Sequence, residues 1–389
     1  MFGAFFWGTF SDTKGRRMPY TMTLVITCIF GTLSSFAFNF TSLCITLFFL
    51  GFGVGGNMPT DGALYLEFLP KEYHYLLTFM SVFFSFGAVI ASVFGYVILP
   101  CEGEMCDNSQ WRTMLMVVSL ITFCMLLIRS FLIKLPETPK FLMSQGKTDE
   151  TIIVLQNIAR VNGNQIDKKE LQMAECEDEF EDQDENIERG SLSELLGQKW
   201  RRTTLLIWSI WTITSIAYTM FNVFLPKFLE TLEQDDIKPT LRQVYWDYMI
   251  YSLAGMPGSV IASYMIETRL GRKGTMTLSA LGSSLSLFIF SAIKSRLVMV
   301  LSSSSVSFLA TLLYAVIYGY TPEVFDTSVR GTAVGTASAL GRIAGIISPV
   351  LAGLLLITNT SLPLYVSVVG YLCVGVCILM LPFETRRKQ

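Results

Sequence analysis

Long apolar stretches recur along almost the whole chain, and they limit what it can fold into more than any other feature. After a short apolar start at residues 2–10, ten stretches are each close to the ~20 residues that a helix needs to cross the hydrocarbon core of a membrane. In lipid, a helix satisfies its own backbone N–H and C=O groups, so such stretches fold as helices. The sequence therefore predicts an all-α, multi-pass membrane protein. The stretches are 19–38, 43–66, 75–99, 112–134, 203–226, 245–266, 274–293, 297–320, 331–357 and 363–382.

The composition argues against several other classes. Only 15% of the 389 residues are charged, against ~25% in soluble domains. The net charge of −2 provides no basic field for nucleic acid. A lone histidine, His74, and eight cysteines without metal-type spacing offer no metal site. We therefore expect no enzyme, no cofactor, no metal and no nucleic-acid partner.

One long polar segment, 136–202, interrupts the pattern. Its run ECEDEFEDQDENIE (175–188) has nine acidic residues of fourteen, which favours a solvated linker because it cannot bury apolar surface. The segment divides the chain into an N-terminal helical bundle at 1–135 and a C-terminal one at 203–382, followed by a tail at 383–389.

The positions of Lys and Arg predict the orientation in the membrane. If the turn with Arg16 and Arg17 faces the cytosol, alternation of the spans puts most connecting Lys and Arg on that side. The other side receives two N-glycosylation acceptors, Asn39 and Asn359, and the segment from Cys101 to Cys106. We therefore expect a cytosolic C-terminus, in a plasma membrane or in a vacuolar or vesicle membrane.

The chain also contains a parallel repeat. Gly15-Arg16-Arg17 recurs as Gly271-Arg272-Lys273, an offset of 271 − 15 = 256, and Glu67 matches Glu323 at the same offset. A Pro-Glu-Thr triplet at 136–138 closes the first half much as Pro-Phe-Glu-Thr at 382–385 closes the second. Two copies of a multi-helix unit on either side of a polar loop are typical of secondary transporters.

Several motifs carry a family resemblance. Gly8-x3-Asp12-x2-Gly15-Arg16-Arg17 resembles the signature loop between helices 2 and 3 of the major facilitator superfamily. PETPKFL (136–142) resembles the end of helix 6 in its sugar porters, while GFGVGGNMPTDGALYLEFLP (51–70) is similar to the synaptic-vesicle-protein-related and organic-ion branch, of fungal type. The resemblance implies two pseudo-repeated six-helix bundles that move a small organic solute (an anion, zwitterion or sugar-like molecule) by alternating access. It also implies a monomer and coupling to protons.

The same resemblance bears on the start of the chain. Members of the family have twelve helices, whereas this sequence has ten full spans and the partial one at 2–10. We therefore expect helix 1 and half of helix 2 to be absent, through an incomplete gene model or a fragment. A genuinely shortened protein is the alternative, and it would weaken the case for transport.

Charged residues at the helix ends are the candidates for gating. The resemblance places Asp12 against the start of a neighbouring helix near Thr327, where the helix dipole favours a carboxylate. In the second copy Thr268 replaces this aspartate, with Glu267 beside it as a possible substitute. Ordinary membrane anchors and solvated end charges are the alternative interpretation. The gating set is Gly8, Asp12, Gly15, Arg16, Arg17, Glu67, Glu137, Glu267, Arg272, Glu323 and Arg330.

Two ionisable residues lie well inside predicted spans, where charge is costly and usually faces a cavity or a partner. In organic-ion relatives the position of Arg342 helps to choose the charge of the ligand, so the resemblance implies an anionic or zwitterionic solute. Asp61 is the candidate proton site. The alternative is a structural ion pair of Asp61 with Arg342 or with another residue. Arg129 is expected to extend to the membrane boundary.

Further candidate ligand contacts are polar or aromatic. Asn57 lies in a glycine-interrupted helix, next to Pro59. Trp211, Tyr218 and Asn222 fall close to one face of a helix, where they can stack on and hydrogen-bond a ligand; helix packing is the alternative. The rival function is a transporter-like receptor or partner-binding membrane protein without transport.

Overall fold

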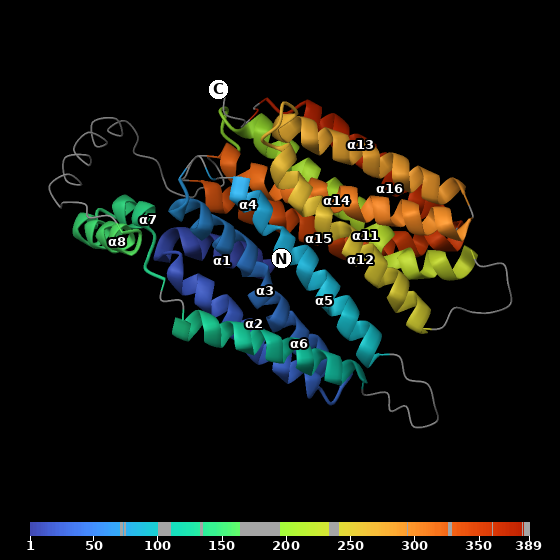
Figure 1. Ribbon diagram of the computed structural model, residues 1–389, viewed down its shortest axis with the longest axis horizontal. Coiled ribbons are helices and arrows are strands. Elements are labelled where there is room, and N and C mark those ends of the chain that lie inside the picture. Colours follow the sequence, from blue (N-terminus) through green and yellow to red (C-terminus); the bar gives the residue numbers. More distant parts are fainter. Residues whose placement is uncertain are drawn as a thin grey trace.

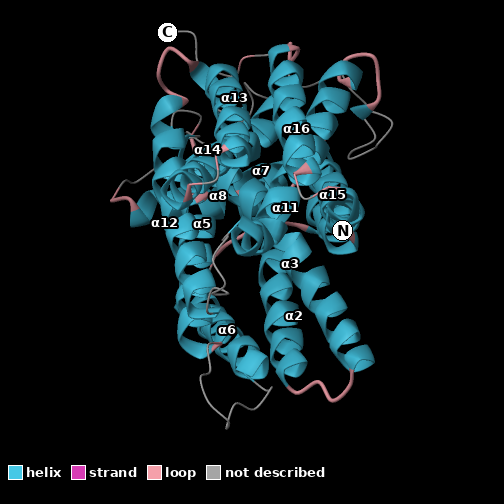
Figure 2. Cartoon of the chain, turned by 90° about the vertical axis from the view of Figure 1, so that its right-hand side faces the viewer, coloured by secondary structure: helices cyan, strands magenta, loops and turns pink. Residues whose placement is uncertain are grey.

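The computed structural model describes residues 1–70, 73, 75–99, 110–132, 135–163, 195–232, 241–293, 295–325, 329–359, 361–382 and 384. Within these ranges the regular secondary structure is helical, which confirms the predicted all-α class (Figure 2). The acidic run, His74, the Cys101–Cys106 segment and Thr327 lie outside the described residues. The helices of the N-terminal half are α1 (Phe2–Lys14), α2 (Arg17–Ser35), α3 (Phe40–Phe68), α4 (Tyr75–Met80), α5 (Val82–Ile98), α6 (Gln110–Leu127) and the π-helical η2 (Ile128–Leu132). After α7 (Pro139–Ser144) and α8 (Thr148–Val161), the C-terminal half contains α11 (Arg201–Leu232), α12 (Leu241–Met265), α13 (Gly271–Ala292), α14 (Arg296–Val324), α15 (Arg330–Thr358) and α16 (Leu362–Leu379).

The two halves of the chain form two groups of helices that lie side by side (Figure 1). In the N-terminal half α2 packs on α3 and α6, and α1 packs on α3. In the C-terminal half α11 packs on α15 and α16, and α13 packs on α14 and α16. The halves meet chiefly where α5 contacts α12 and where α1 contacts α15. Between α5 and α12, the buried hydroxyls of Ser92 and Ser252 are hydrogen-bonded at 2.9 Å.

Among the described residues, nine helices or helix pairs are long and apolar enough to cross a membrane. The tenth predicted stretch, 245–266, is also helical, as α12, but its serines and tyrosines leave it less apolar than the other nine. Large apolar side chains cover the outside of the molecule, as Phe40 and Ile357 do with more than four-fifths of their surface exposed. Such an exterior fits lipid rather than water.

Many of the buried polar side chains are serines and threonines that satisfy themselves locally. Thr60 Oγ1 donates to the Gly56 carbonyl at 2.8 Å, and Ser302 Oγ donates to the Val298 carbonyl at 2.6 Å. Because each hydroxyl bonds a carbonyl one turn earlier, these residues add no unpaired polar group to the helix interfaces. Their small size also allows close packing of helices in lipid.

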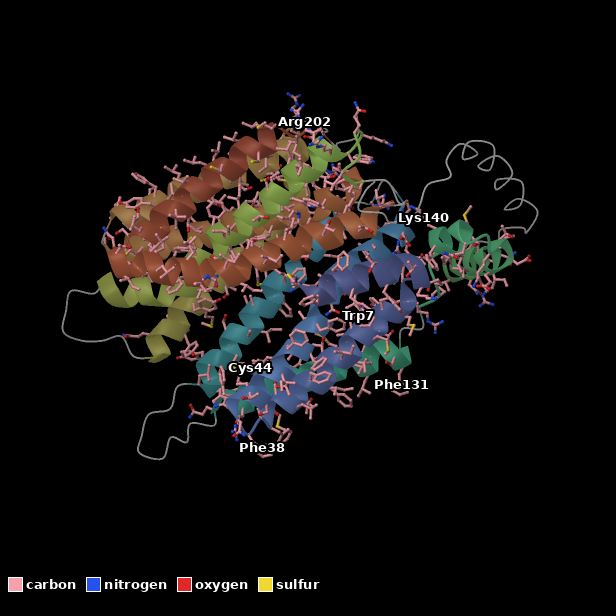
Figure 3. All side chains as sticks on the ribbon, turned by 180° about the vertical axis from the view of Figure 1, so that it is seen from behind. Trp7, Phe38, Cys44, Phe131, Lys140 and Arg202 are labelled. Atoms are coloured by element: carbon pink, nitrogen blue, oxygen red, sulfur yellow. The ribbon has the colours of Figure 1, made fainter. Side chains whose placement is uncertain are left out.

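The repeated glycine-arginine loops lie at one end of the molecule, called here the signature end and defined by Gly15 and Gly271. The helices that start at these loops, α2 and α13, finish at Ser35 and Ala292, at the opposite end. In Figure 3, Lys140 marks the signature end, because its neighbours Glu137 and Phe141 lie beside Gly15. Phe38, next to Asn39, marks the opposite end.

Candidate functional site

Arg16 at the signature end forms a buried ion pair with Glu67 on α3. Its Nη2 and Nε atoms both lie 3.0 Å from Glu67 Oε1, and the two side chains are 6% and 2% exposed. Neutral hydroxyls complete the arrangement: Thr138 donates to Glu67 Oε2 at 2.5 Å, and Ser11 accepts from Arg16 Nη1 at 3.0 Å. Each charged atom in this cluster therefore has a polar neighbour, which a buried ion pair requires.

Arg272 forms the matching pair in the C-terminal half. Its Nε and Nη2 donate to the two carboxylate oxygens of Glu323 at 2.9 and 3.2 Å, in a bidentate arrangement. The additional contact is a second carboxylate, because Glu267 lies 3.5 Å from Arg272 Nη1 and is half exposed. Glu267 thus contacts the repeated arginine, and its role as a substitute for the carboxylate of Asp12 stays a prediction.

A further glutamate caps a helix in each half. The Glu137 carboxylate accepts from the backbone N–H groups of Arg16 and Arg17 at 2.8 and 3.3 Å, just where α2 begins. The Glu384 carboxylate accepts from the N–H groups of Arg272 and Lys273 at 2.9 and 3.1 Å, where α13 begins. A carboxylate at a helix N-terminus satisfies unpaired donors and the helix dipole together.

Two glycines make this capture possible. Gly15 has φ 105° and ψ 164°, and Gly271 has φ 64°, so both glycines have a positive φ. A Cβ atom would lie 2.6 Å from Glu137 Oε2 at Gly15 and 2.9 Å from Glu384 Oε1 at Gly271. Both the backbone angle and the limited space therefore favour glycine at these positions.

The remaining gating candidates lie near these clusters. Gly8 is buried on α1, which packs on α15, and the Arg17 side chain is exposed. Arg330 starts α15 and donates from Nε to the Pro322 carbonyl at 2.7 Å. The side chain of Asp12 lies outside the described residues. Each cluster contact named above joins elements of one half, so these contacts brace each half, and their gating role stays a prediction.

A cavity of about 690 Å³ lies between the two halves, among α1, α3, α11, α14 and α15. Its walls are largely apolar and include several aromatic side chains, and Arg342 contributes a positive charge. The lining includes Phe48, Phe52, Trp211, Tyr314, Tyr318 and Arg342.

A second cavity, of about 360 Å³, is lined by Asn57, Asp61, Tyr318, Arg330 and Arg342. Arg342 and Tyr318 line both cavities, so they stand where the two spaces adjoin. Three of the predicted ligand contacts, Asn57, Asp61 and Arg342, therefore line the same cavity. Trp211 lies on the larger cavity, and its indole N–H donates to Thr321 Oγ1 at 3.0 Å.

Two buried polar atoms in these walls have no hydrogen-bond partner among the described residues: Arg342 Nε and Asn57 Oδ1. An unpaired buried donor or acceptor is costly, by roughly 1–3 kcal/mol. Both atoms belong to residues that line the smaller cavity, and Arg342 adds a positive charge to its unpaired donor.

Asp61 pairs with Arg129, not with Arg342. Arg129 Nη2 lies 3.2 Å from Asp61 Oδ1, and the Arg129 side chain is 11% exposed. The prediction that Arg129 extends to the membrane boundary is therefore wrong. The physical reason is local: Arg129 lies in η2, where the helix widens to π geometry, and the Asp61 carboxylate offers a closer partner for its charge.

Tyr218 and Asn222 line neither of these two cavities. Asn222 Nδ2 donates to the hydroxyls of Tyr218 and Tyr251 at 3.3 and 3.1 Å, and Asn222 Oδ1 accepts from Tyr248 at 3.3 Å. The contacts of Asn222 with Tyr248 and Tyr251 join α11 to α12. For this pair the helix-packing alternative describes the observed contacts, whereas Trp211 has the predicted place on a cavity.

Sequence reasoning missed Tyr314 and Tyr318. Tyr318 packs edge-on to Trp211, with ring centroids 4.8 Å apart, and stacks on Phe84 of the other half at 6.1 Å. Tyr314 stacks on Tyr318 at 6.0 Å. The i, i+4 spacing of the two tyrosines puts them on one helix face, and this signal was available. The sequence did not indicate which face of the helix borders the cavity.

Two helical halves with apolar exteriors, related by a repeat and separated by a charged, aromatic-lined cavity, define a multi-pass membrane transporter. The whole of residues 1–386 matches the family model described as "Sugar (and other) transporter". The chain belongs to this family of the major facilitator superfamily, as its motifs predicted, and it is a transporter rather than an enzyme.

Individual proteins agree with this assignment. An uncharacterised transporter of the major facilitator type from Schizosaccharomyces pombe is 32% identical over 100% of this chain and 76% of its own length. The synaptic vesicle 2-related protein of Bos taurus is 28% identical over 98% of this chain and 69% of its own length, as the motif at 51–70 suggested. The solved structure of a proton:xylose symporter, XylE, superimposes with a TM-score of 0.75 at 18% identity, covering 99% of this chain and 84% of the other, which shows the shared fold.

Proposed function

We propose that this transporter carries a small organic anion by alternating access. The observation that carries the proposal is Arg342, whose Nε is buried and has no partner among the described residues, where two cavities adjoin. A carboxylate satisfies both the charge and the donor. Aromatic walls, including Trp211 and Tyr318, favour an anion with an apolar body.

We further propose that the cycle is coupled to protons through Asp61, which lines the smaller cavity. A carboxyl group in a membrane span binds and releases a proton without other chemistry, and intramembrane acids commonly serve in such relays. The structural likeness to a proton:xylose symporter is consistent with this assignment. The signature end is assigned to the cytosol, with the C-terminus on the same side, in a plasma, vacuolar or vesicle membrane.

The anion proposal is tested with purified protein in liposomes. Labelled benzoate and lactate, each compared with its uncharged amide, are offered in a counterflow assay. We expect exchange of a carboxylate but not of its amide, and loss of exchange in Arg342→Ala with unchanged protein yield. Ile346→Ala, one turn along α15 and on the same cavity, is the matched control and should retain exchange.

Normal carboxylate exchange by Arg342→Ala would overturn the anion assignment. Binding of the carboxylate without exchange would instead support the rival function, a transporter-like receptor. The two outcomes are separated by measuring ligand-dependent thermal stability of the same preparations.

A further inference from the structure

Arg129 is held by more than its ion pair with Asp61. Its Nη1 donates to the backbone carbonyl of Tyr20 at 2.7 Å, and the guanidinium lies over the Tyr20 ring. Both contacts come from α2, whereas Asp61 belongs to α3. Because an arginine stays protonated and Tyr20 contacts it without the carboxylate, Arg129 has two contacts that do not depend on the charge of Asp61.

Asp61 is placed differently. Its side chain is 33% exposed, three times the fraction for Arg129, and it lines the smaller cavity. The ion pair is also single, through one guanidinium nitrogen and one carboxylate oxygen at 3.2 Å. One side of the Asp61 carboxyl group therefore contacts Arg129, and the other side faces the cavity between the halves.

Among the described residues, the other titratable or charged groups named here around Asp61 come from three elements. Tyr20 of α2 lies beside the pair, and Tyr318 of α14 faces the same cavity. Arg330 and Arg342 of α15 line that cavity too. Arg129 is the cation in direct contact, so it dominates the local field at the carboxylate.

We propose that Arg129 is a positioning residue that sets the charge state of Asp61. It holds the carboxylate ionised until a proton arrives from the cavity, and it remains on Tyr20 when the pair opens. The proton adds to a carboxylate oxygen and leaves from the same group, so only an O–H bond forms and breaks. The inference rests on the proposed function in taking Asp61 as the proton carrier.

The π-helical turn explains how the Arg129 side chain reaches both Tyr20 and Asp61. A π-helical turn adds a residue to the helical turn, so it changes the direction in which the following side chains project. Arg129 lies within this turn, Ile128–Leu132, at the end of the apolar span Gln110–Phe131. Its side chain thereby reaches α2 and α3, 109 and 68 residues earlier in the chain.

The test reads the protonation of Asp61 directly. Infrared difference spectra of the purified, membrane-reconstituted protein are recorded across pH, and the carboxylic C=O band of Asp61 is assigned by its loss in Asp61→Asn. In Arg129→Gln the midpoint of this band should rise by about one pH unit or more, because the carboxylate has lost its adjacent cation. Arg129→Lys keeps the charge and should shift it less.

Arg112→Gln is the matched control, since Arg112 also donates to a backbone carbonyl from α6, that of Ala37 at 3.0 Å. It should leave the Asp61 midpoint unchanged. An unchanged midpoint in Arg129→Gln, or an equal rise in Arg112→Gln, would overturn the inference. Uptake driven by a pH gradient is measured on the same samples: if the band shifts as expected but uptake ignores pH, proton coupling fails while the role of Arg129 stands.

Discussion

Arg16 in the N-terminal half and Arg272 in the C-terminal half occupy matching loops, 272 − 16 = 256 positions apart, and each pairs with a glutamate at the same offset. The backbone contacts agree as well, because a later glutamate captures two N–H groups beside each loop. The contacts that complete each arginine differ. Thr138 and Ser11, both neutral and buried, complete the first cluster, whereas a half-exposed carboxylate, Glu267, completes the second.

This difference shows which parts of the repeat are constrained. A loop that turns at a glycine and presents two N–H groups needs a carboxylate, and both halves keep one. The remaining guanidinium nitrogen contacts Ser11 in the first cluster and Glu267 in the second, and either a hydroxyl or a carboxylate can accept its hydrogen bond. The clusters are therefore alike in backbone and variable in side chain.

The largest effect is expected from removing either arginine. Arg16→Met leaves Glu67 buried without its cation, and Arg272→Met does the same to Glu323, so each should cost about 3–5 kcal/mol of stability. Thermal unfolding of the detergent-solubilised protein measures the loss. Arg17→Met, on an exposed side chain, is the control and should unfold as the wild type does. A wild-type melting curve for Arg16→Met would show that the ion pair does not brace the N-terminal half.

Replacing either glycine should cost less stability than removing an arginine, and the loss should differ between the two halves. At Gly15 the backbone occupies a region open almost only to glycine, so Gly15→Ala should cost about 2–3 kcal/mol. At Gly271 the φ of 64° is accessible to other residues at about 1–2 kcal/mol, so Gly271→Ala should be milder. The same unfolding assay ranks the two variants. The approach of the glutamate is also closer at Gly15, at 2.6 Å against 2.9 Å, so the reverse ranking would contradict both reasons given for this order.

The last comparison concerns the additional contact of each ion pair, and it includes the smallest expected effect. Thr138→Ala removes a hydrogen bond to a buried carboxylate and should cost about 1.5–3 kcal/mol. Glu267→Gln weakens a half-exposed ion pair and should cost less than about 1 kcal/mol, with the loss shrinking further in high salt. Unfolding measured at low and high ionic strength compares them. Equal, salt-independent losses would contradict the distinction between the two clusters.

Much of the architecture could be predicted because it rests on local patterns. The length and apolarity of each stretch determine a spanning helix, and the 256-residue repeat places Arg16 and Arg272 in equivalent loops. Helical spacing also indicates that Trp211, Tyr218 and Asn222 share a face. It does not indicate what that face meets, and only Trp211 borders one of the two cavities.

The sequence by itself determined the class of protein, its two halves and the ionisable residues inside the spans, because transfer of charge and apolar surface into lipid depends on residue type and length. Tertiary structure alone decided the partners. Asp61 meets Arg129, 68 residues later in the chain, since α3 and η2 both belong to the N-terminal half and the π-helical turn directs the arginine toward α3. Tyr318 and Arg342 stand between the cavities because two helices, 24 residues apart in the chain at these positions (342 − 318 = 24), meet the other half there.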